Sequence, residues 1–350
     1  MITKLRQYIS WWLLGFFTII LIVACDRSFN SLESDPTVLN NLESCRLVSH
    51  EMGKTEVCGQ PQKVLALSPH ILDIILALGV QPTGLAQNVS SQIQTYDNPP
   101  AQIPYLGRWV TTEPVGVGSR GTPSLERIKL LQPDLILGES FFQQNLYPLL
   151  TQIAPTLLFD DLNNPNEIQS WKQDIDGIAE ALGREEQVEE LLKTHDQQIA
   201  QARTALQPVL QTYPRVFVMS SNLGATYIAS RPESAVSRLL QEIGFEIVRP
   251  SGFPERYVAI SQEVIPQVET DLIIVTTVED NVELNTEDSK PQATMREKWA
   301  QNPLLSSMPV FQQGRVFFVD YYLWNGVSRG PLSDQLILEA LPDLLLPIVQ

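Results

Sequence analysis

Short apolar runs alternate with helix-like segments along most of this chain, and one long helical tract interrupts the alternation. From residue 63 onward, each strand-like run is followed by a helix pattern and then by another apolar run. This order is typical of α/β proteins, in which helices cover a sheet. Gly183 marks a break in the helical tract at 166–206. We therefore predict an α/β fold with two lobes and the helical tract as the strut between them.

The same pattern sets the expected boundaries. In the first half we expect strands at 63–67, 83–86 and 134–137, and helices at 71–78 and 124–131. In the second half we expect strands at 216–219, 227–229, 272–275 and 315–319, and helices at 234–243, 262–268 and from 331 onward. The predicted segments are a signal peptide at 1–25, a tether at 26–44, an N-terminal lobe at 45–165, the helical tract at 166–206 and a C-terminal lobe at 207–350. A cleft is expected where the lobes meet, since ligand sites usually form at such junctions.

The first 25 residues have the pattern of an export signal. Lys4 and Arg6 precede an apolar run at 11–23, which is shorter than the roughly 20 residues that a membrane-spanning helix needs. The residues at 21–25, Leu-Ile-Val-Ala-Cys, resemble a bacterial lipobox, in which the cysteine is lipidated. We expect a lipid on Cys25, with a plain signal peptide or a retained anchor as the alternative.

Charge and histidine content exclude several classes of protein. The 350 residues include 24 basic and 40 acidic side chains, so the formal net charge is -16. Such a chain has no long-range attraction to nucleic acid or to an anionic membrane surface. Three histidines make a His-rich metal site hard to build.

Two cysteines remain once Cys25 is assigned to lipid. Cys45 and Cys58 form an even pair in an exported protein, so we predict a disulfide between them. A metal site with His50 is the alternative, but one histidine between two cysteines is a weak zinc pattern.

A local repeat links the two halves of the chain. Glu126 opens a predicted helix eight residues before Asp134, and Glu263 does the same eight residues before Asp271. The repeat indicates two pseudo-equivalent lobes that each present one glutamate. The alternative is that acidic residues favour the first turn of any helix because of the helix dipole.

The segment at 116–121 reads G-x-G-x-x-G, and Glu139 lies about twenty residues further on. In a dinucleotide-binding fold this motif must follow a strand directly, and the residues at 111–114 do not form one. We therefore interpret the glycines as a flexible loop that shapes the cleft.

The histidines do not indicate a hydrolase. His195 lies between charged residues, so we expect it to be solvated, and His50 lies near the disulfide loop. His70 follows a strand, where α/β folds place functional loops, and it is either a pocket residue or a helix-start residue without ligand contact. No serine or cysteine lies in a motif that would pair with it as a nucleophile.

Arginines in predicted loops favour an anionic ligand. The guanidinium group presents a planar fork of donors that suits carboxylate, hydroxamate or catecholate oxygens. The loop arginines are Arg108, Arg120, Arg231, Arg249, Arg256 and Arg329. The aromatic residues that could form apolar walls beside them are Trp109, Phe141, Phe142, Tyr257, Tyr321, Tyr322 and Trp324. The alternatives are ordinary surface charges and core packing.

A series of short segments, in order over about 300 residues, resembles the iron-siderophore substrate-binding proteins of bacterial ABC importers. This group binds ferrichrome, ferric citrate and similar chelates. The segments are those at 61–67, 77–84, 117–120, 123–128, 132–136, 314–319 and 324–326. The resemblance implies two Rossmann-like α/β lobes joined by a single long helix, with little hinge closure when ligand binds.

The resemblance also implies roles for particular residues. An arginine at the place of Arg120 contacts the chelating oxygens in hydroxamate-binding members, and Phe142 stands where an aromatic residue contributes. Glu126 and Glu263 match the glutamates that dock each lobe on the permease. Asp26, after the lipid cysteine, resembles a retention signal for the inner membrane. A tryptophan that some members carry before the second-lobe helix has no match at 252–255, so the siderophore stays open.

We therefore expect a non-enzymatic receptor without a cofactor that binds iron only as a ferric siderophore complex. It would be a monomer, anchored by lipid at the outer face of the cytoplasmic membrane, that delivers its ligand to an ABC permease. The expected ligand-binding residues are Arg120, Phe142, Trp109, Arg108, His70, Tyr257, Arg256, Trp324 and Tyr322. A haem or corrinoid carrier of the same architecture and an exported hydrolase are the alternatives.

Overall fold

The computed structural model describes residues 44–88, 93–159, 171–222, 227–229, 234–252, 258–278, 291–324 and 329–350. The chain divides into two units between Ser44 and Cys45, and every element below belongs to the unit Cys45–Gln350. Several residues singled out from the sequence lie outside the described residues: Lys4, Arg6, Cys25, Asp26, Arg231, Arg256 and Tyr257. In the described part, no helix has the length and apolar character needed to cross a membrane.

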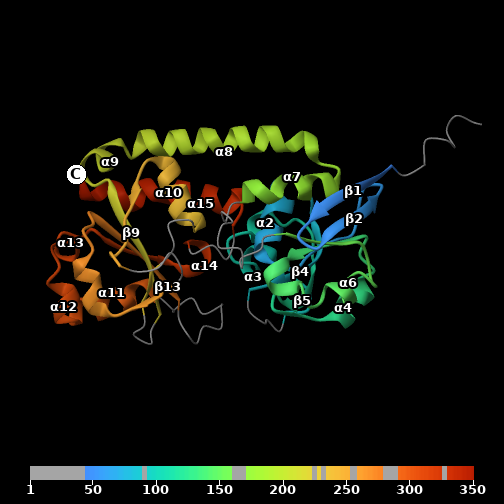
Figure 1. Cartoon of the computed structure of the whole chain (residues 1–350), viewed down its shortest axis with the longest axis horizontal. Helices are drawn as coiled ribbons and strands as arrows, with labels where there is room; N and C mark the ends of the chain where they lie inside the picture. The colour runs from blue at the N-terminus through green and yellow to red at the C-terminus, as the bar shows by residue number, and fades with distance from the viewer. Residues whose placement is uncertain are drawn as a thin grey trace, which may run out of the picture. The chain divides into compact units, whose positions relative to one another are not determined.

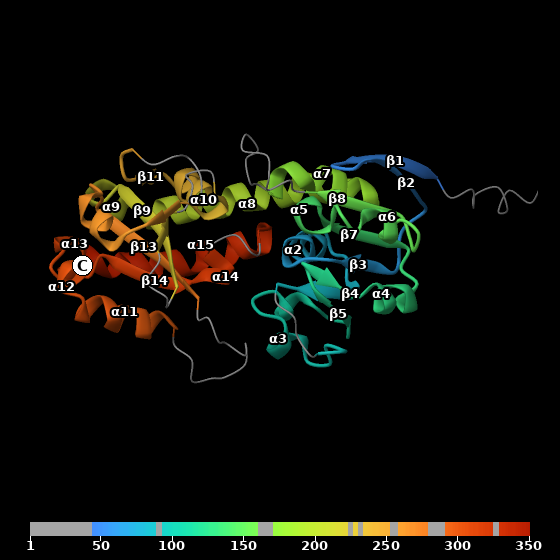
Figure 2. The same ribbon diagram turned by 60° about the horizontal axis from the view of Figure 1, so that its bottom comes forward.

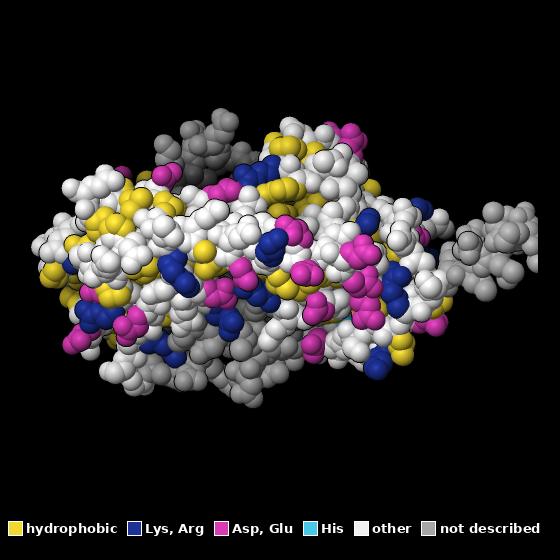
Figure 3. Space-filling model, turned by 90° about the horizontal axis from the view of Figure 1, so that it is seen from above, with side chains coloured by type: hydrophobic (Ala, Val, Ile, Leu, Met, Phe, Trp, Pro, Cys, Tyr) yellow, Lys and Arg dark blue, Asp and Glu magenta, His cyan; other side chains and the backbone are white. Residues whose placement is uncertain are grey.

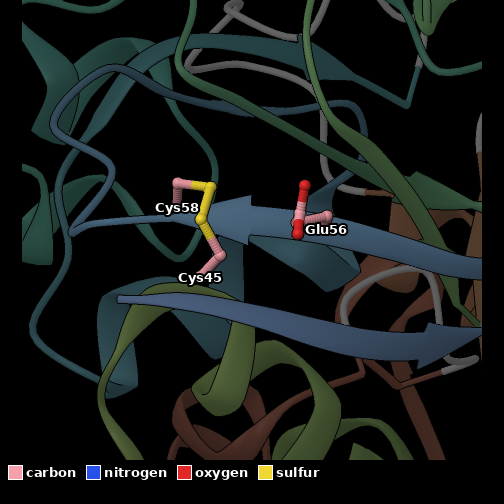
Figure 4. Close-up of side chains that lie close together, drawn as sticks. All are labelled: Cys45, Glu56 and Cys58. Atoms are coloured by element: carbon pink, nitrogen blue, oxygen red, sulfur yellow. A yellow bond between two sulfur atoms is a disulfide. The ribbon is translucent and has the colours of Figure 1, made fainter. Parts of the chain in front are cut away.

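An antiparallel hairpin opens the described chain. Strands β1 (Cys45–His50) and β2 (Gly53–Cys58) pair along their whole length, and a disulfide joins Cys45 to Cys58, the pairing that the sequence favours. Glu56 lies beside the disulfide (Figure 4), but both cysteine sulfurs are bonded to each other and so cannot act as thiolate ligands for a metal. His50 accepts a hydrogen bond from the backbone of Leu158 at 3.2 Å, which ties the hairpin to the first sheet.

The first lobe contains a six-stranded sheet with helices on both faces. The strands are β3 (Val64–Ala66), β4 (Pro82–Gln87), β5 (Val115–Ser119), β6 (Thr122–Pro123), β7 (Leu135–Glu139) and β8 (Thr156–Phe159). Their order is β6-β5-β4-β3-β7-β8, with β6 antiparallel and the other pairs parallel. Successive residues alternate between two cores: Val64 packs with the helices α2 (Pro69–Ala77) and α7 (Trp171–Leu182), and Leu65 packs on the opposite face with α4 (Leu125–Leu131). Burial on both faces explains why the strands read as continuous apolar runs.

The glycines at 116–121 do not form the flexible loop predicted from the sequence. Gly116 and Gly118 lie within β5, which pairs with β4. A Cβ on Gly116 would come within 2.3 Å of the carbonyl oxygen of Ile93, so only glycine fits there. The motif therefore reflects close backbone packing in a strand.

The second lobe repeats this architecture. Its strands are β9 (Arg215–Asn222), β10 (Tyr227–Ala229), β11 (Glu246–Ile247), β12 (Val258–Ile260), β13 (Leu272–Val278) and β14 (Val316–Asp320). The order is β12-β10-β9-β13-β14, with β11 also paired to β9, and the pairs β9–β13 and β13–β14 are parallel. Val216 and Phe217 again point into opposite cores. The predicted helix at 262–268 is instead a 3-10 helix, η3 (Gln262–Gln267), with Pro266 inside it.

The remaining helices cover the two sheets (Figures 1 and 2). They are α3 (Pro99–Gln102), η2 (Gly107–Trp109), α5 (Ser140–Gln143), α6 (Tyr147–Leu150), α9 (Gln207–Thr212), α10 (Ala235–Ile243), α11 (Pro291–Gln301), α12 (Pro303–Ser306), α13 (Pro309–Gln312), α14 (Tyr321–Trp324), α15 (Pro331–Leu345) and η4 (Leu346–Ile348). The α/β fold with two lobes is thus as predicted. The exact segment boundaries stay predictions.

The helical tract consists of two helices. α7 belongs to the core of the first lobe, and α8 (Glu185–Ala205) follows after Gly183, whose φ of +64° suits glycine. α8 packs against α7 of the first lobe and against α10 and α15 of the second, so it is the connecting helix. Its outward face carries acidic and basic side chains side by side (Figure 3).

His195 of α8 is not solvated, contrary to the prediction. The ring is 1% exposed, donates through Nε2 to Asp334 at 3.0 Å, and packs edge-on against Trp171. The charged neighbours that suggested exposure lie on the outer side of the helix: Asp196 is 75% exposed.

The Glu–Asp repeat corresponds to a repeated hydrogen-bond arrangement. Asp134 accepts the backbone N–H of Lys63, just before β3, at 2.9 Å. Asp271 accepts the backbone N–H of Arg215, the first residue of β9, also at 2.9 Å. Since β3 pairs with β7 as β9 pairs with β13, the two aspartates occupy equivalent places in the two lobes.

Candidate functional site

Arg120 lies just beyond the carboxyl end of β5, in the turn to β6. Its backbone N–H donates to the carbonyl of Gln87 at 2.8 Å, and its own carbonyl accepts a hydrogen bond from the side chain of Gln143. Its guanidinium carbon stands 4.1 Å above the ring centre of Phe142. The Arg120 side chain is 15% exposed. The two residues that the resemblance assigns to ligand binding therefore form one cation–π pair.

Glu139, the last residue of β7, lies beside this pair and is fully buried. Its Oε1 accepts a hydrogen bond from Arg329 at 2.6 Å, and its Oε2 is 3.8 Å from Nη1 of Arg120. Burial alone would raise the pKa of Glu139, but the positive charges of Arg329, His70 and Arg120 and a hydrogen bond from Ser68 hold that pKa below its usual value. We call Arg120, Glu139 and Arg329 the arginine–glutamate cluster.

Arg329 belongs to the second lobe but is fastened to the first by both backbone and side chain. Its carbonyl accepts a hydrogen bond from Nδ1 of His70, and Nε2 of His70 donates to Asp174 at 3.0 Å. Because both ring nitrogens face acceptors, the arrangement suits a doubly protonated ring. His70 is 1% exposed, so the expectation that it lines a pocket is wrong: the ring is a contact between lobes.

The start of α15 continues this contact. Asp73 of α2 is fully buried and accepts the backbone N–H groups of Leu332 and Ser333, each at 2.9 Å. A Cβ on Gly330 would come within 2.2 Å of Asp73, so the close approach requires glycine. We call Asp73, Leu332 and Ser333 the α15 anchor. It fixes the second lobe to the first.

A second contact between the lobes involves Tyr105, Asp320 and Tyr322. Burial raises the pKa of the Tyr105 hydroxyl above its usual range, and the Asp320 carboxylate, hydrogen-bonded to that hydroxyl, adds to the effect. Tyr322 follows β14, is half-buried, and lies close enough to Tyr105 to influence its pKa. Tyr322 is therefore placed at the junction of the lobes, where the sequence predicted a ligand wall.

Three other predicted ligand residues do not join the cluster. The side chain of Gln81, before β4, forms hydrogen bonds with the backbone of Trp109 and Thr111. The backbone N–H of Arg120 instead donates to the carbonyl of Gln87, at the other end of β4. Six residues of strand separate Gln81 from Gln87, roughly 20 Å. Arg108 stacks on Trp109 and pairs with Glu339 of α15 at 3.6 Å. Arg108 and Trp109 therefore lie at the opposite end of β4 from Arg120, and their role as ligand residues stays a prediction.

Trp324 is also placed differently from the prediction. It is 5% exposed and packs in the core of the second lobe, so the ring is not a ligand wall. Phe141 is 41% exposed beside Phe142, which leaves it accessible at the cluster.

Three hollows in the described part of the chain lie away from the cluster. One of about 280 Å³ lies between α8 and α15. A small one of about 20 Å³ adjoins Trp171 and Asp334. The third, about 440 Å³, lies between η3 and α12. None of them is lined by a predicted ligand residue.

The two predicted docking glutamates are exposed. Glu126 lies in the first turn of α4 and Glu263 in the first turn of η3. A hydrogen bond from the Ser261 side chain lowers the pKa of Glu263, so its carboxylate is ionised at neutral pH. Each lobe thus presents one carboxylate at an equivalent place.

Sequence reasoning missed Glu139 and Asp73 as site residues. Glu139 was noted only as a member of a dinucleotide motif, although an acidic residue at the end of an otherwise apolar strand is itself a signal, because a buried carboxylate needs a partner. Asp73 had a similar signal, as the charged residue within the apolar run at 71–78.

Similarities to known proteins agree with this geometry. Residues 64–323 match the family described as periplasmic binding protein. The Fe(3+)-citrate-binding protein YfmC of Bacillus subtilis is 25% identical over 326 residues, covering 91% of this chain and 92% of that protein. The achromobactin-binding periplasmic protein of Dickeya dadantii is 28% identical over 80% of this chain and 85% of that protein. The crystal structure of Staphylococcus aureus SirA complexed with staphyloferrin B aligns with a TM-score of 0.66, at 22% identity, over 86% of this chain and 98% of that chain, which shows a shared fold.

Proposed function

Since the chain belongs to the periplasmic binding protein family, we propose that it is the substrate-binding receptor of an ABC importer and that its ligand is a ferric siderophore. The observation that carries the proposal is the Arg120–Phe142 pair at the carboxyl edge of the first sheet. Ligands of α/β folds bind outside the carboxyl ends of strands, and a guanidinium group suits the oxygen atoms of an iron chelate. Two relatives, which match 91% and 80% of this chain, are named for binding Fe(3+)-citrate and achromobactin.

The iron remains within its chelator in this proposal. Arg120 donates hydrogen bonds to chelate oxygens, Phe142 and Phe141 offer aromatic surface, and Tyr322 contributes from the second lobe. The α15 anchor and the His70 contact hold the lobes together, which supports binding with little change in the angle between them.

A titration of the purified full-length protein in detergent tests the proposal. Ferric citrate, ferric hydroxamates, ferric catecholates, haem and cobalamin would each be added while tryptophan fluorescence is recorded. Saturable quenching by one ferric chelate, but not by its iron-free form, supports the proposal. A response to haem or cobalamin alone would contradict it. Arg120→Ala should weaken binding about tenfold or more, as expected for a lost charge-assisted hydrogen bond.

Glu126 and Glu263 dock the lobes on the permease in this proposal. Their exposure and their equivalent positions support it, because a permease built from two similar halves would present two similar basic sites. The double variant Glu126→Ala/Glu263→Ala should bind the chelate normally but abolish iron uptake. Normal uptake by the double variant would disprove the assignment.

The membrane location is proposed from the sequence around Cys25. Lipid on this cysteine would hold the receptor at the outer face of the cytoplasmic membrane, since acyl chains contribute about 0.8 kcal/mol per buried CH₂. Cys25→Ala should move the protein from the membrane fraction to the soluble fraction. Unchanged fractionation would contradict lipidation.

A further inference from the structure

Glu139 carries the one negative charge of the arginine–glutamate cluster. Two guanidinium groups and one carboxylate leave one net positive charge on the three side chains. The neighbouring His70 is paired with Asp174, so that pair adds no net charge when the ring is protonated. The cluster therefore presents one positive charge at the carboxyl edge of the first sheet.

The two arginines differ in their contact with Glu139. Arg329 approaches Oε1 at 2.6 Å and is 5% exposed, so its charge is neutralised inside the protein. Arg120 stands 3.8 Å from Oε2, which has no hydrogen-bond partner, and the Arg120 side chain is 15% exposed. Of the two guanidinium groups in the cluster, that of Arg120 is consequently the more accessible.

We propose that Glu139 is a positioning residue that sets the charge preference of the ligand site. It offsets the charge of Arg329, so the three side chains of the cluster together carry one net positive charge, and the guanidinium group of Arg120 lies above Phe142. The favoured ligand then presents an anionic oxygen group, such as a carboxylate or a deprotonated hydroxamate, toward Arg120. This inference rests on the proposed function and adds the residue that determines the charge of the chelate accepted.

A purely structural role for Glu139 predicts something different. If Glu139 only stabilised Arg329 within the lobe contact, its removal would weaken the binding of every chelate in proportion to the loss of stability. If Glu139 sets the charge of the site, anionic and cationic chelates should respond in opposite directions. At an effective dielectric constant near 20, a unit charge about 12 Å from a charged ligand group changes the affinity by about tenfold.

A series of three variants separates the two roles. Arg329→Gln leaves the cluster with no net charge, Glu139→Gln gives it two positive charges, and the double variant restores the one positive charge of the wild type. Binding of anionic ferric citrate, ferrichrome, which is uncharged, and ferrioxamine B, which carries a protonated amine, would be measured by calorimetry at low and high salt. Glu190→Gln on the outer face of α8 makes the same charge change far from the site and serves as the control.

We expect Glu139→Gln to strengthen the binding of the anionic chelate about tenfold relative to the cationic one, and Arg329→Gln to shift the preference the other way by a similar factor. The double variant should return the preference to that of the wild type, although it lacks both side chains. If only one chelate binds, its affinities for the variants are compared with one another. An anionic chelate should bind most tightly to Glu139→Gln and least tightly to Arg329→Gln, and a cationic chelate should show the reverse order. Should Glu139→Gln fail to fold, Arg329→Gln and the double variant still decide the question.

Three results would overturn the inference in distinguishable ways. Equal shifts for all chelates, or a double variant that departs from the wild type as far as the single variants do, would leave the proposed function intact and remove Glu139 as the determinant. Unchanged chelate binding by Arg120→Ala would show that the ligand does not bind at the arginine–glutamate cluster. Absence of binding by the wild type to any ferric chelate would remove both the proposed function and the inference.

Discussion

The carboxylate of Asp73 in α2 accepts both the backbone N–H and the hydroxyl of Ser333, at the start of α15, through a single oxygen. Its other oxygen accepts the N–H of Leu332 at 2.9 Å. The first N–H groups of any helix lack partners within that helix. Asp73 therefore caps α15 from a position some 260 residues earlier in the chain, and the negative charge also suits the positive end of the helix dipole.

Replacing Asp73 by asparagine should destabilise the protein. The Asn amide nitrogen is a donor and would face N–H groups that are donors as well. We expect the free energy of unfolding to fall by about 1–3 kcal/mol near neutral pH. Urea denaturation measures the change, and Ser333→Ala, which removes one donor only, should cost less. An unchanged unfolding midpoint in the Asn variant would show that the anchor contributes nothing.

The contribution of Asp73 should also depend on pH. Burial raises the pKa of Asp73 from 3.8 to about 6, an effect opposed by the hydrogen bonds from Ser333 and Leu332 and strengthened by nearby Asp334. The folded protein then holds this proton more tightly than the unfolded chain does. The associated stability is greatest below the unfolded pKa and is lost as the pH rises through about 6.

The pH prediction is tested against the Asn variant, which has no titrating group at this place. The deficit of Asp73→Asn relative to the wild type should grow by up to about 3 kcal/mol when the pH is lowered from about 7 to about 4. Urea titrations of both proteins across this range give the difference directly. A deficit that stays constant or shrinks toward low pH would contradict the assignment.

The sheets were predictable because their strands are apolar on both faces. Val64 and Leu65 serve opposite cores, so the strand reads as an uninterrupted apolar run. β5 was missed because Gly116 and Gly118 remove the β-branched and aromatic side chains that mark a strand. The reason for Gly116, an approach to Ile93, lies outside its local sequence.

The burial of His195 had a signal that its neighbours obscured. Val188, His195, Ile199 and Ala202 are the buried residues of α8, at spacings of seven, four and three. These spacings define one helix face. By contrast, the contact of Glu139 with Arg329 joins residues 190 positions apart and had no local signal.

Asp334 should be essential for the packing of α7 and α8 against α15. Its Oδ2 accepts hydrogen bonds from Nε1 of Trp171 at 2.8 Å and from Nε2 of His195 at 3.0 Å. Asp334→Ala leaves two buried donors without partners, and we expect a loss of about 2–4 kcal/mol in the free energy of unfolding. Asp343→Ala, at an exposed place on the same helix, is the control and should change little. Equal effects of the two substitutions on urea denaturation would disprove this role.

The equivalence of the two lobes makes a paired prediction. Asp134→Ala removes the acceptor for the backbone N–H groups of Gln62 and Lys63, and Asp271→Ala removes that for Arg215. Each should lower the free energy of unfolding by about 0.5–1.5 kcal/mol, because a strand loses the acceptor for its first donors but water can reach those donors. Asp271→Ala should cost more, since it also leaves the guanidinium of Arg215 without its 2.9 Å partner.

The two losses should add, because the sites lie in different lobes and share no partner. Denaturation of the two single variants and the double variant measures this, and chelate binding should be unchanged in all three. A strong effect of one substitution combined with none of the other would show that the repeated sequence pattern does not mark equivalent places in the two lobes.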